Sequence, residues 1–418
     1  MRFRHLLLLA LLCLAGCGGS SRPQNSVDVR LLNAVPGSEP LDLLIDDGVG
    51  SSGVAFGTAG PYTNLTFGSR VVKVRSATTG EVLAQTEASF GPNGVYTMVA
   101  QGTRTAVTVV PMNEENTVSS GRIRLRLLGA APESASLDLY ITPTTDISAA
   151  TPQVAGVPYS AVGTYVTLEP GSYAITLTQN GTKEVVFQAA PQEFSAGTRA
   201  TIAALASAGG SLVSAVLLPT LGDARALANT LSRVKAVNAV VGSGPYNFRA
   251  DSTLLFASVP YQGSSDYVIA ASGARAVRIE PANVPGSAAA SLAATLQPAR
   301  DHTLIAAGTV AAPRLLLVTD DNTAPGATAA RLRFANVRAD GVVVEVRRNG
   351  DGLVAALGAD TVTPRVSVTA AEAQTIEFVA GGGVVASTGS VTFEANGVYT
   401  VYLFGTASAL ATRIVRDR

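Results

Sequence analysis

The chain has 418 residues, with 30 basic and 30 acidic side chains, no Trp and only two cysteines. This length suggests two to four domains, and the balanced charge without a basic run argues against a nucleic-acid partner. Only 14% of the residues are charged, and glycines punctuate alternating runs of β-branched residues. Such a composition predicts all-β domains.

The N-terminal segment has the zones of an export signal. A short basic start is followed by the apolar run 6–14, which is too short for a bilayer-spanning helix of about twenty residues. The run leads into Leu14-Ala15-Gly16-Cys17, which resembles the lipobox of bacterial lipoprotein signals. The resemblance implies cleavage between Gly16 and Cys17 and a lipid on the Cys17 thiol. A plain secretory signal with a chance cysteine is the alternative interpretation.

The residues after the cysteine are small and polar, which predicts a flexible stalk over 17–27. Gly18, not Asp, follows the cysteine, and by analogy with enteric bacteria this favours the outer membrane. Cys13 would leave with the signal 1–16. We therefore expect a lipid-anchored cell-envelope protein whose body has no disulfide.

Similar segments recur along the chain at intervals of roughly 100 residues, the size of one β-sandwich domain. Each segment opens on an apolar residue, a cation and a further apolar stretch, at 29–36, 125–132, 234–240 and 332–337. Period-2 alternation in such a strand predicts that the cation faces solvent. Each segment closes on a second strand, at 94–103, 197–206, 301–309 and 397–406.

The middle of each unit carries further common motifs. An L-D-L strand occurs at 41–43 and 137–139. The P-Y segments that begin at 61, 158 and 260 are expected to correspond to one another, while V-T-P-R replaces P-Y in the fourth unit. The spacing predicts four tandem immunoglobulin-like β-sandwiches over 28–112, 121–220, 232–319 and 329–418. Residues 221–234 are expected to form one or two helical turns between units.

These motifs resemble the DUF4397 family, a domain of unknown function in secreted and surface proteins of bacteria. The resemblance covers the first two units well, the third moderately and the fourth weakly. It implies a β-sandwich on an exported protein. It implies no catalytic residue and no cofactor.

The residues that could support catalysis are few. His302 is the one histidine outside the signal, and we expect it to fill the strand position that Tyr96 and Tyr399 hold in other units. Residues 48–53, G-V-G-S-S-G, match a dinucleotide fingerprint by letter, but V-A-F-G-T follows where a helix is needed. We predict a loop there, no catalytic residue and no cofactor.

Acidic residues gather at the unit junctions, at 113–116 and 320–322. Calcium prefers such oxygen ligands but needs six to eight of them, so a solvated linker is the favoured interpretation and no metal is predicted. A glycan-binding platform usually employs Trp, which this chain lacks.

The prediction for function is a non-enzymatic, lipid-anchored binding, adhesive or spacer module with an unknown protein or glycan ligand. Four domains end to end would reach roughly 130 Å from the membrane, from a radius of gyration near 13 Å each. Two alternatives remain open at this point: a periplasmic accessory lipoprotein of an envelope complex, and a carboxylate-dependent hydrolase.

Overall fold

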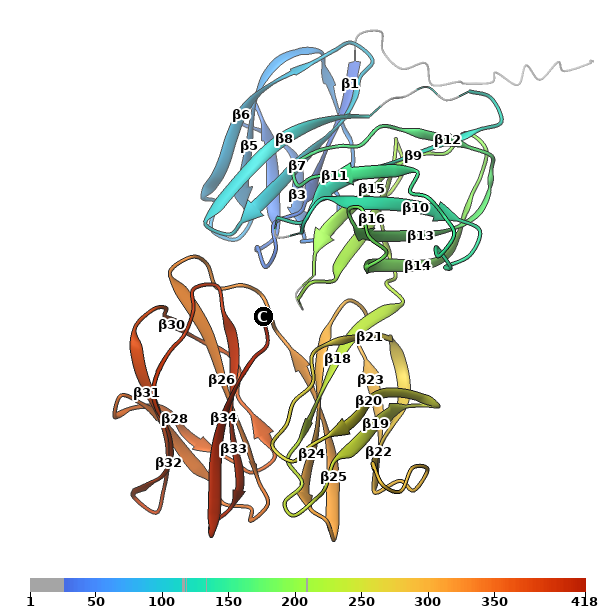
Figure 1. The fold of residues 1–418 in the computed structure, drawn as a ribbon. Coiled ribbons are helices and arrows are strands. Elements are labelled where there is room, and N and C mark those ends of the chain that lie inside the picture. The colour runs from blue at the N-terminus through green and yellow to red at the C-terminus, as the bar shows by residue number, and fades with distance from the viewer. Residues whose placement is uncertain (1–25, 115–116, 118, 133, 208–209) are drawn as a thin grey trace, which may run out of the picture.

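The computed structural model describes residues 26–114, 117, 119–132, 134–207 and 210–418. Throughout these residues the chain forms β-strands and turns without a helix (Figure 1). The strands form eight sheets that pair into four β-sandwiches, which confirms the predicted all-β tandem-sandwich fold. No helix long and apolar enough to cross a membrane occurs in this part of the chain. The predicted lipobox, Leu14 to Cys17, lies outside the described residues.

The first sandwich contains β1 (Ser26–Asn33), β2 (Leu41–Ile45), β3 (Gly48–Val54), β4 (Thr63–Thr66), β5 (Gly68–Ser76), β6 (Val82–Phe90), β7 (Val95–Thr103) and β8 (Ala106–Glu114). The order in its two sheets is β4-β1-β7-β8 and β3-β2-β5-β6. Strands β1 and β7 run parallel at the centre of the first sheet. A constant-type immunoglobulin domain has seven strands, whereas this sandwich has eight, four in each sheet.

The second sandwich contains β9 (Ile123–Ala130), β10 (Leu137–Thr142), β11 (Val154–Val157), β12 (Val166–Leu168), β13 (Gly171–Gln179), β14 (Val185–Phe194), β15 (Arg199–Ala206), β16 (Val213–Pro219) and β17 (Arg225–Leu227). Its sheets have the orders β12-β9-β15-β16-β17 and β11-β10-β13-β14. The segment 221–234, expected to be helical, instead supplies the edge strand β17 and the start of β18. The helical expectation was wrong because Leu227 packs into the second core as part of that strand.

The third sandwich contains β18 (Leu231–Asn238), β19 (Tyr246–Ala250), β20 (Thr253–Val259), β21 (Val268–Ala271), β22 (Gly273–Pro281), β23 (Ala290–Leu296), β24 (Asp301–Thr309) and β25 (Ala312–Asp320). The fourth contains β26 (Ala329–Arg338), β27 (Val344–Arg348), β28 (Asp351–Leu357), β29 (Thr361–Val362), β30 (Val366–Thr369), β31 (Ala373–Ala380), β32 (Gly383–Thr392), β33 (Val398–Thr406) and β34 (Ala409–Arg416). Both sandwiches repeat the central parallel pair, as β18 with β24 and β26 with β33.

The opening strand of each sandwich is buried on both faces. In β1, Val29 and Leu31 point into the core of the first sandwich, and the alternate residues Arg30 and Leu32 face the neighbouring sandwich. Side chains alternate between the two faces of a strand, so an apolar residue on each face requires a layer on each face. The second layer is another domain.

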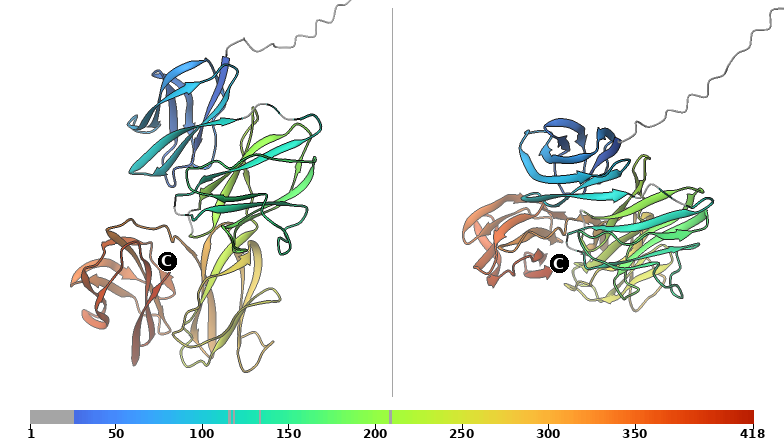
Figure 2. Two further views of the ribbon diagram at one scale, coloured as in Figure 1. Left: turned by 45° about the horizontal axis from the view of Figure 1, so that its top comes forward. Right: turned by 90° about the horizontal axis from the view of Figure 1, so that it is seen from above.

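The four sandwiches are therefore joined in two face-to-face pairs (Figure 2). One apolar cluster joins the first and second sandwiches and contains Leu32, Ala34, Val99, Met112, Leu128, Ala130, Ala203, Leu205, Val216 and Leu218. The other joins the third and fourth and contains Val237, Ala239, Ile305, Ala307, Ala335, Val337, Tyr402 and Phe404. The expected end-to-end string was wrong, because within each pair a sheet of one sandwich packs face to face against a sheet of the other.

Two further expectations need correction. Residues 48–53 form most of strand β3 and not a loop, and a turn at Phe56 and Gly57 follows the strand. The expected correspondence of the P-Y segments was wrong, because Tyr62 corresponds to Tyr165 and not to Tyr159. One residue beyond the last paired positions, Tyr62 lies opposite Arg30 and Tyr165 lies opposite Arg126. Tyr159 instead corresponds to Phe56. Each lies two residues after the last paired residue of its strand, Val157 of β11 and Val54 of β3.

Candidate functional site

The cation in each opening strand is buried, contrary to the solvent-facing prediction. The exposed fractions are 1% for Arg30, 8% for Arg126, 1% for Lys235 and 3% for Arg333. The prediction failed because the outer face of each opening strand is covered by a partner sandwich. In the parallel strand beside it, each cation lies opposite a buried threonine: Thr97, Thr201, Thr303 and Thr400 respectively.

In the second pair, Arg333 crosses from the fourth sandwich to the third. Its Nη1 lies 2.6 Å from Oδ1 of Asp320, and its Nε donates to the hydroxyl of Thr400. Oδ2 of Asp320 accepts from the hydroxyls of Thr303 and Tyr267, each at 2.6 Å. Burial opposes ionisation of Asp320, but Arg333, Lys235 and the two hydroxyls outweigh it and hold its pKa below the usual value.

Lys235 crosses the same interface in the opposite direction. Its Nζ contacts Oδ1 of Asp417, at the end of the last strand of the fourth sandwich. Oδ2 of Asp417 accepts from Thr400 at 2.5 Å and from Nη2 of Arg365 at 2.7 Å. Arg365 lies opposite Arg333 across β30 and β26, one residue beyond their last paired positions. It thus occupies the place that Tyr62, Tyr165 and Tyr267 occupy elsewhere, which gives the V-T-P-R segment a structural role.

The first pair holds a related cluster with fewer carboxylates. Nη2 of Arg30 lies 3.1 Å from Oε1 of Glu114, and Nη1 donates to the carbonyl of Gly222 in the second sandwich at 2.9 Å. Tyr62 donates to Glu114 at 2.9 Å, and the Arg30 guanidinium stacks on its ring. In the second sandwich, Thr220 takes the strand-end place of Glu114.

These contacts replace both earlier interpretations of the acidic junctions, the calcium site and the solvated linker. Glu114 and Asp320 are only 1% exposed, so neither belongs to a solvated linker, and each carboxylate is bonded to a buried arginine. Within the described ranges, no group of three or more His, Cys, Asp or Glu side chains is placed to hold a metal ion. Residues 115 and 116 of the first junction lie outside those ranges. The junction acids act as partners of the strand cations.

His302 lies in the strand position expected for it. It pairs with Val234 across the parallel strands, as Tyr96 pairs with Val29 and Tyr399 with Leu332. The Nε2 atom of His302 accepts from the amide of Gln297 at 3.1 Å. The Tyr96 and Tyr399 hydroxyls accept from the amide five residues upstream in the same way. Burial lowers the pKa of His302, against the raising effect of Asp320 and Asp301, so the ring is a neutral structural acceptor.

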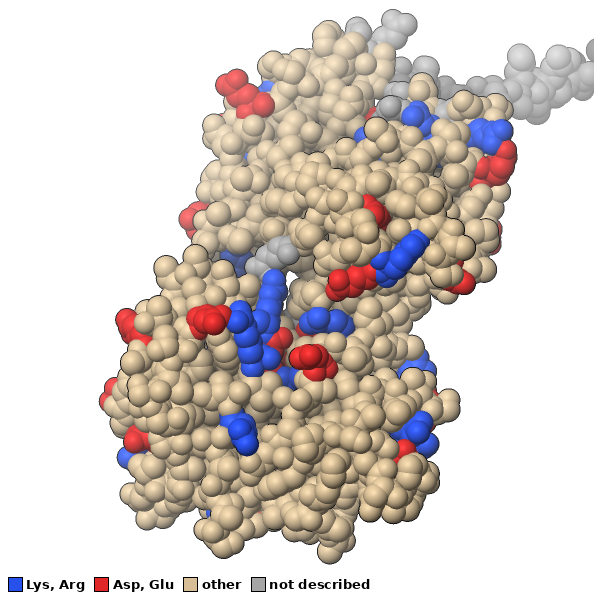
Figure 3. Space-filling model, viewed as in Figure 1, with Lys and Arg blue, Asp and Glu red and all other residues tan. Residues whose placement is uncertain are grey.

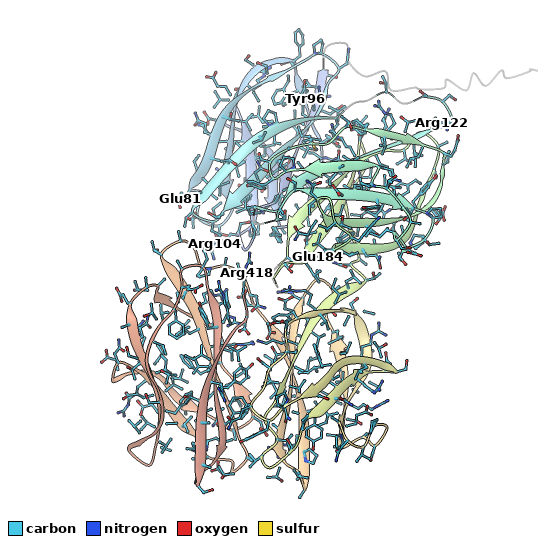
Figure 4. All side chains as sticks on the ribbon, viewed as in Figure 1. Glu81, Tyr96, Arg104, Arg122, Glu184 and Arg418 are labelled. Atoms are coloured by element: carbon cyan, nitrogen blue, oxygen red, sulfur yellow. The ribbon has the colours of Figure 1, made fainter. Side chains whose placement is uncertain are left out.

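An open cleft lies where the two pairs meet, and it is the candidate binding site. Its volume is about 580 Å³, within the range of ligand pockets. It is lined by residues of all four sandwiches and of the connector between the third and fourth, including Thr103, Arg104, Thr105, Ser134, Ser207, Ser211, Leu212, Arg233, Thr323, Pro325 and Arg418. Figure 3 shows basic side chains gathered at the hollow between the upper and lower pairs. Figure 4 shows Arg104 and Arg418 close together at this junction.

The lining of the cleft suits binding better than proton transfer. Hydroxyls and two exposed or half-exposed guanidinium groups supply hydrogen-bond donors, and prolines and Leu212 supply an apolar floor. Arg104 stands at the tip of the β7–β8 hairpin and is exposed. Such donors favour carboxylate, sulfate or phosphate groups on a ligand.

The comparisons with solved structures give only remote likenesses. The Bacillus anthracis TIE protein is 11% identical, with 91% of this chain and 68% of that chain covered and a TM-score of 0.16. A structure described as alpha-glucan binding by a streptococcal virulence factor is 8% identical, with 42% and 92% covered and a TM-score of 0.15. The pneumococcal glycogen-degrading virulence factor SpuA is 7% identical, with 86% and 37% covered and a TM-score of 0.15. At these TM-scores the likenesses carry no argument.

The comparison with protein families gives a clear result. No curated protein matches the chain. The family described as "Domain of unknown function (DUF4397)" matches residues 27–140 and 232–347. Each stretch covers one whole sandwich, the first or the third, and the opening two strands of the next. Residues 141–220, where a good resemblance was expected, fall outside both stretches. Because the two stretches together hold more than half of its residues, the chain belongs to the DUF4397 family.

Proposed function

We propose that the chain is a non-enzymatic envelope protein, anchored by lipid at Cys17, whose two sandwich pairs frame a ligand-binding cleft. The observation that carries this proposal is the cleft itself, lined by residues of all four sandwiches. Binding residues are characteristically placed on loops that a rigid scaffold positions. The paired packing fixes the loops within each pair relative to one another.

The placement of the charged residues supports a binding role over a catalytic one. The junction carboxylates Glu114 and Asp320 are buried against arginines, where no substrate reaches them. The hydrolase alternative requires an accessible carboxylate pair with separated pKa values. Asp417 lines the cleft but is itself buried and held by Arg365.

The exposed groups of the cleft indicate the ligand class. Arg104 and Arg418 provide positive charge, while the threonine and serine hydroxyls offer further hydrogen bonds. An acidic partner, either an acidic glycan or an acidic peptide segment, fits this lining. The cleft suits a module that recognises such a partner at the cell envelope.

Site-specific photo-crosslinking in living cells tests the cleft. A photoreactive residue at Thr105 is expected to give a defined adduct. The same residue at Ser408 is the matched control, because Ser408 occupies the corresponding place in the β33–β34 hairpin and does not line the cleft. Arg104→Ala should weaken the Thr105 adduct, and Arg413→Ala, an exposed change on β34, should not. Equal labelling at Thr105 and Ser408 would count against the cleft.

Protease shaving of intact cells tests where the pairs are displayed. Release of peptides from all four sandwiches, with a periplasmic marker intact, supports a surface adhesin or spacer. Protection until the outer membrane is opened supports the periplasmic accessory role. Metabolic labelling with an alkyne fatty acid, lost in Cys17→Ser, tests the anchor.

A further inference from the structure

One buried lysine departs from the pattern of the chain. Lys235 is one of only three lysines, and it stands where the other three sandwiches carry arginine. Its side chain is 1% exposed and its Nζ contacts Oδ1 of Asp417, whose side chain is fully buried. The two residues belong to different sandwiches and are 182 positions apart in the chain.

The surroundings of Lys235 favour its neutral amine, which is the nucleophilic form. A lysine amine becomes nucleophilic when it is desolvated or placed beside another cation. Lys235 meets both conditions, because burial together with the nearby Arg333 and Arg365 lowers its pKa to about 7. The ring of Tyr267 covers the ammonium at 5.2 Å and contributes to the exclusion of water.

The surroundings also polarise the carboxyl group. Oδ2 of Asp417 is bonded to Nη2 of Arg365 at 2.7 Å and to the Thr400 hydroxyl at 2.5 Å, and Nη2 of Arg333 lies 3.8 Å away. Fixed donors of this kind stabilise the oxyanion that forms when a nucleophile attacks a carboxyl carbon. The second oxygen, Oδ1, faces Nζ and is the leaving oxygen.

We propose that Lys235 and Asp417 condense into an isopeptide bond that joins the third and fourth sandwiches. Nζ attacks Cγ of Asp417, the C–Oδ1 bond breaks, and Oδ1 leaves as water with two of the three protons of the Lys235 ammonium. The third proton remains on the amide nitrogen, so the ion pair yields one amide and one water and needs no other reactant. The held geometry replaces the activation that a free carboxylate would need.

A nearby carboxylate helps to hold the reacting groups in place. Asp320 is buried in the same cluster, and its charge favours the protonated form of Lys235. Its bonds to Arg333, Thr303 and Tyr267 fix its position. Asp320 is thus a positioning group that remains unchanged by the reaction, and the protons pass from Nζ to the adjacent Oδ1 of Asp417.

Mass spectrometry of the full-length protein tests the proposal directly. The intact mass is expected to be lower than the mass of the processed chain by one water molecule. Trypsin should fail to cut after Lys235 and should release the peptide 234–249 with the dipeptide Asp417-Arg418 attached through the lysine. A full intact mass with normal cleavage after Lys235 would overturn the proposal.

Matched variants separate the covalent bond from an ordinary ion pair. Lys235→Arg keeps the positive charge and introduces the residue of the other three sandwiches. It cannot form the bond, so its intact mass should show no loss of a water molecule. Asp417→Asn should still form the bond, with ammonia as the leaving group, and should reach the same final mass as the wild type. Asp320→Asn should slow bond formation at least tenfold in freshly refolded protein. An unchanged mass deficit in Lys235→Arg would place the lost water elsewhere and contradict the assignment.

Discussion

Arg333 of the fourth sandwich and Asp320 of the third form a buried ion pair, with Nη1 and Oδ1 2.6 Å apart. Neither side chain exposes more than 4% of its surface. A charge so buried is tolerated only with a hydrogen-bonded partner. The pair therefore binds one sandwich to its neighbour in a fixed register, and each residue depends on the other domain for its neutralisation.

Removal of Arg333 should strongly destabilise the second pair. Arg333→Ala leaves Asp320 buried without its main partner, and such changes cost about 3–5 kcal/mol. Chemical denaturation of the full chain measures the loss. Arg331→Ala is the control: its partner Asp321 is half exposed, so a loss of about 0–1 kcal/mol is expected. Equal losses in the two variants would show that the buried pair has no special weight.

The sequence predicted the sandwiches but not their pairing. Alternation and repeated openings identify the strands, because one apolar face per strand is a local property. The burial of Arg30 and Lys235 is not local, since it depends on a sheet contributed by another domain. A signal was nevertheless present: Glu114, Asp320 and Asp417 all stand at the end of a closing hairpin. An acid repeated at one strand position, matched by a repeated cation, indicates an ion pair more than a linker.

The candidate cleft could not be predicted from the sequence. Its lining comes from four domains and includes loop residues such as Pro36, Arg104 and Thr323, and loop residues follow no period. The role of His302 could be predicted, because its strand position corresponds to Tyr96 and Tyr399. Local register carries over between copies, whereas the packing of copies does not.

The apolar part of the interface should contribute as much as its charges. Phe404 is 1% exposed and lies in the cluster between the third and fourth sandwiches, with its ring 5.6 Å from that of Tyr402 and 6.4 Å from that of Tyr261. Phe404→Ala should cost about 3–5 kcal/mol. Val384→Ala, at a site that is 54% exposed, should change the free energy of unfolding by less than about 0.5 kcal/mol. Urea denaturation of both variants checks this, and a small Phe404 effect would mean that the sandwiches pack loosely.

Replacement of Gly129 in the second sandwich by asparagine, the residue at this position in the other three, should lower stability. Gly129 stands where the other three opening strands have Asn33, Asn238 and Asn336. A Cβ at Gly129 would lie 2.3 Å from the carbonyl oxygen of Pro158, so the backbone would have to move. Gly129→Asn should cost about 1–3 kcal/mol.

Thermal unfolding compares Gly129→Asn with a control glycine. At Gly244 a Cβ would meet nothing within 4 Å, so Gly244→Ala should leave the melting temperature close to that of the wild type. A Gly129→Asn protein as stable as the wild type would show that the Pro158 loop shifts freely.

Acidification should weaken the third sandwich through His302. Burial lowers the pKa of this side chain below its ordinary value of 6.5, so below that pH the unfolded chain binds a proton that the folded chain does not. Stability therefore falls as the pH drops from 6.5 toward the folded pKa, by up to about 1.4 kcal/mol per pH unit. Protonation would also turn the Nε2 acceptor into a donor that faces the Gln297 amide.

The variant His302→Tyr isolates this effect. Tyrosine fills the same position in the first and fourth sandwiches and accepts the same amide bond there, and it does not titrate near pH 6. Urea unfolding between pH 5 and pH 6.5 should show a slope in the wild type and a flatter response in the variant. The lowered pKa of Lys235, about 7, lies close to the upper end of this window, but Lys235 is the same in both proteins, so the difference between their slopes reports on His302. A slope that persists in His302→Tyr would assign the acid sensitivity to another buried group, with Asp320 the first to examine.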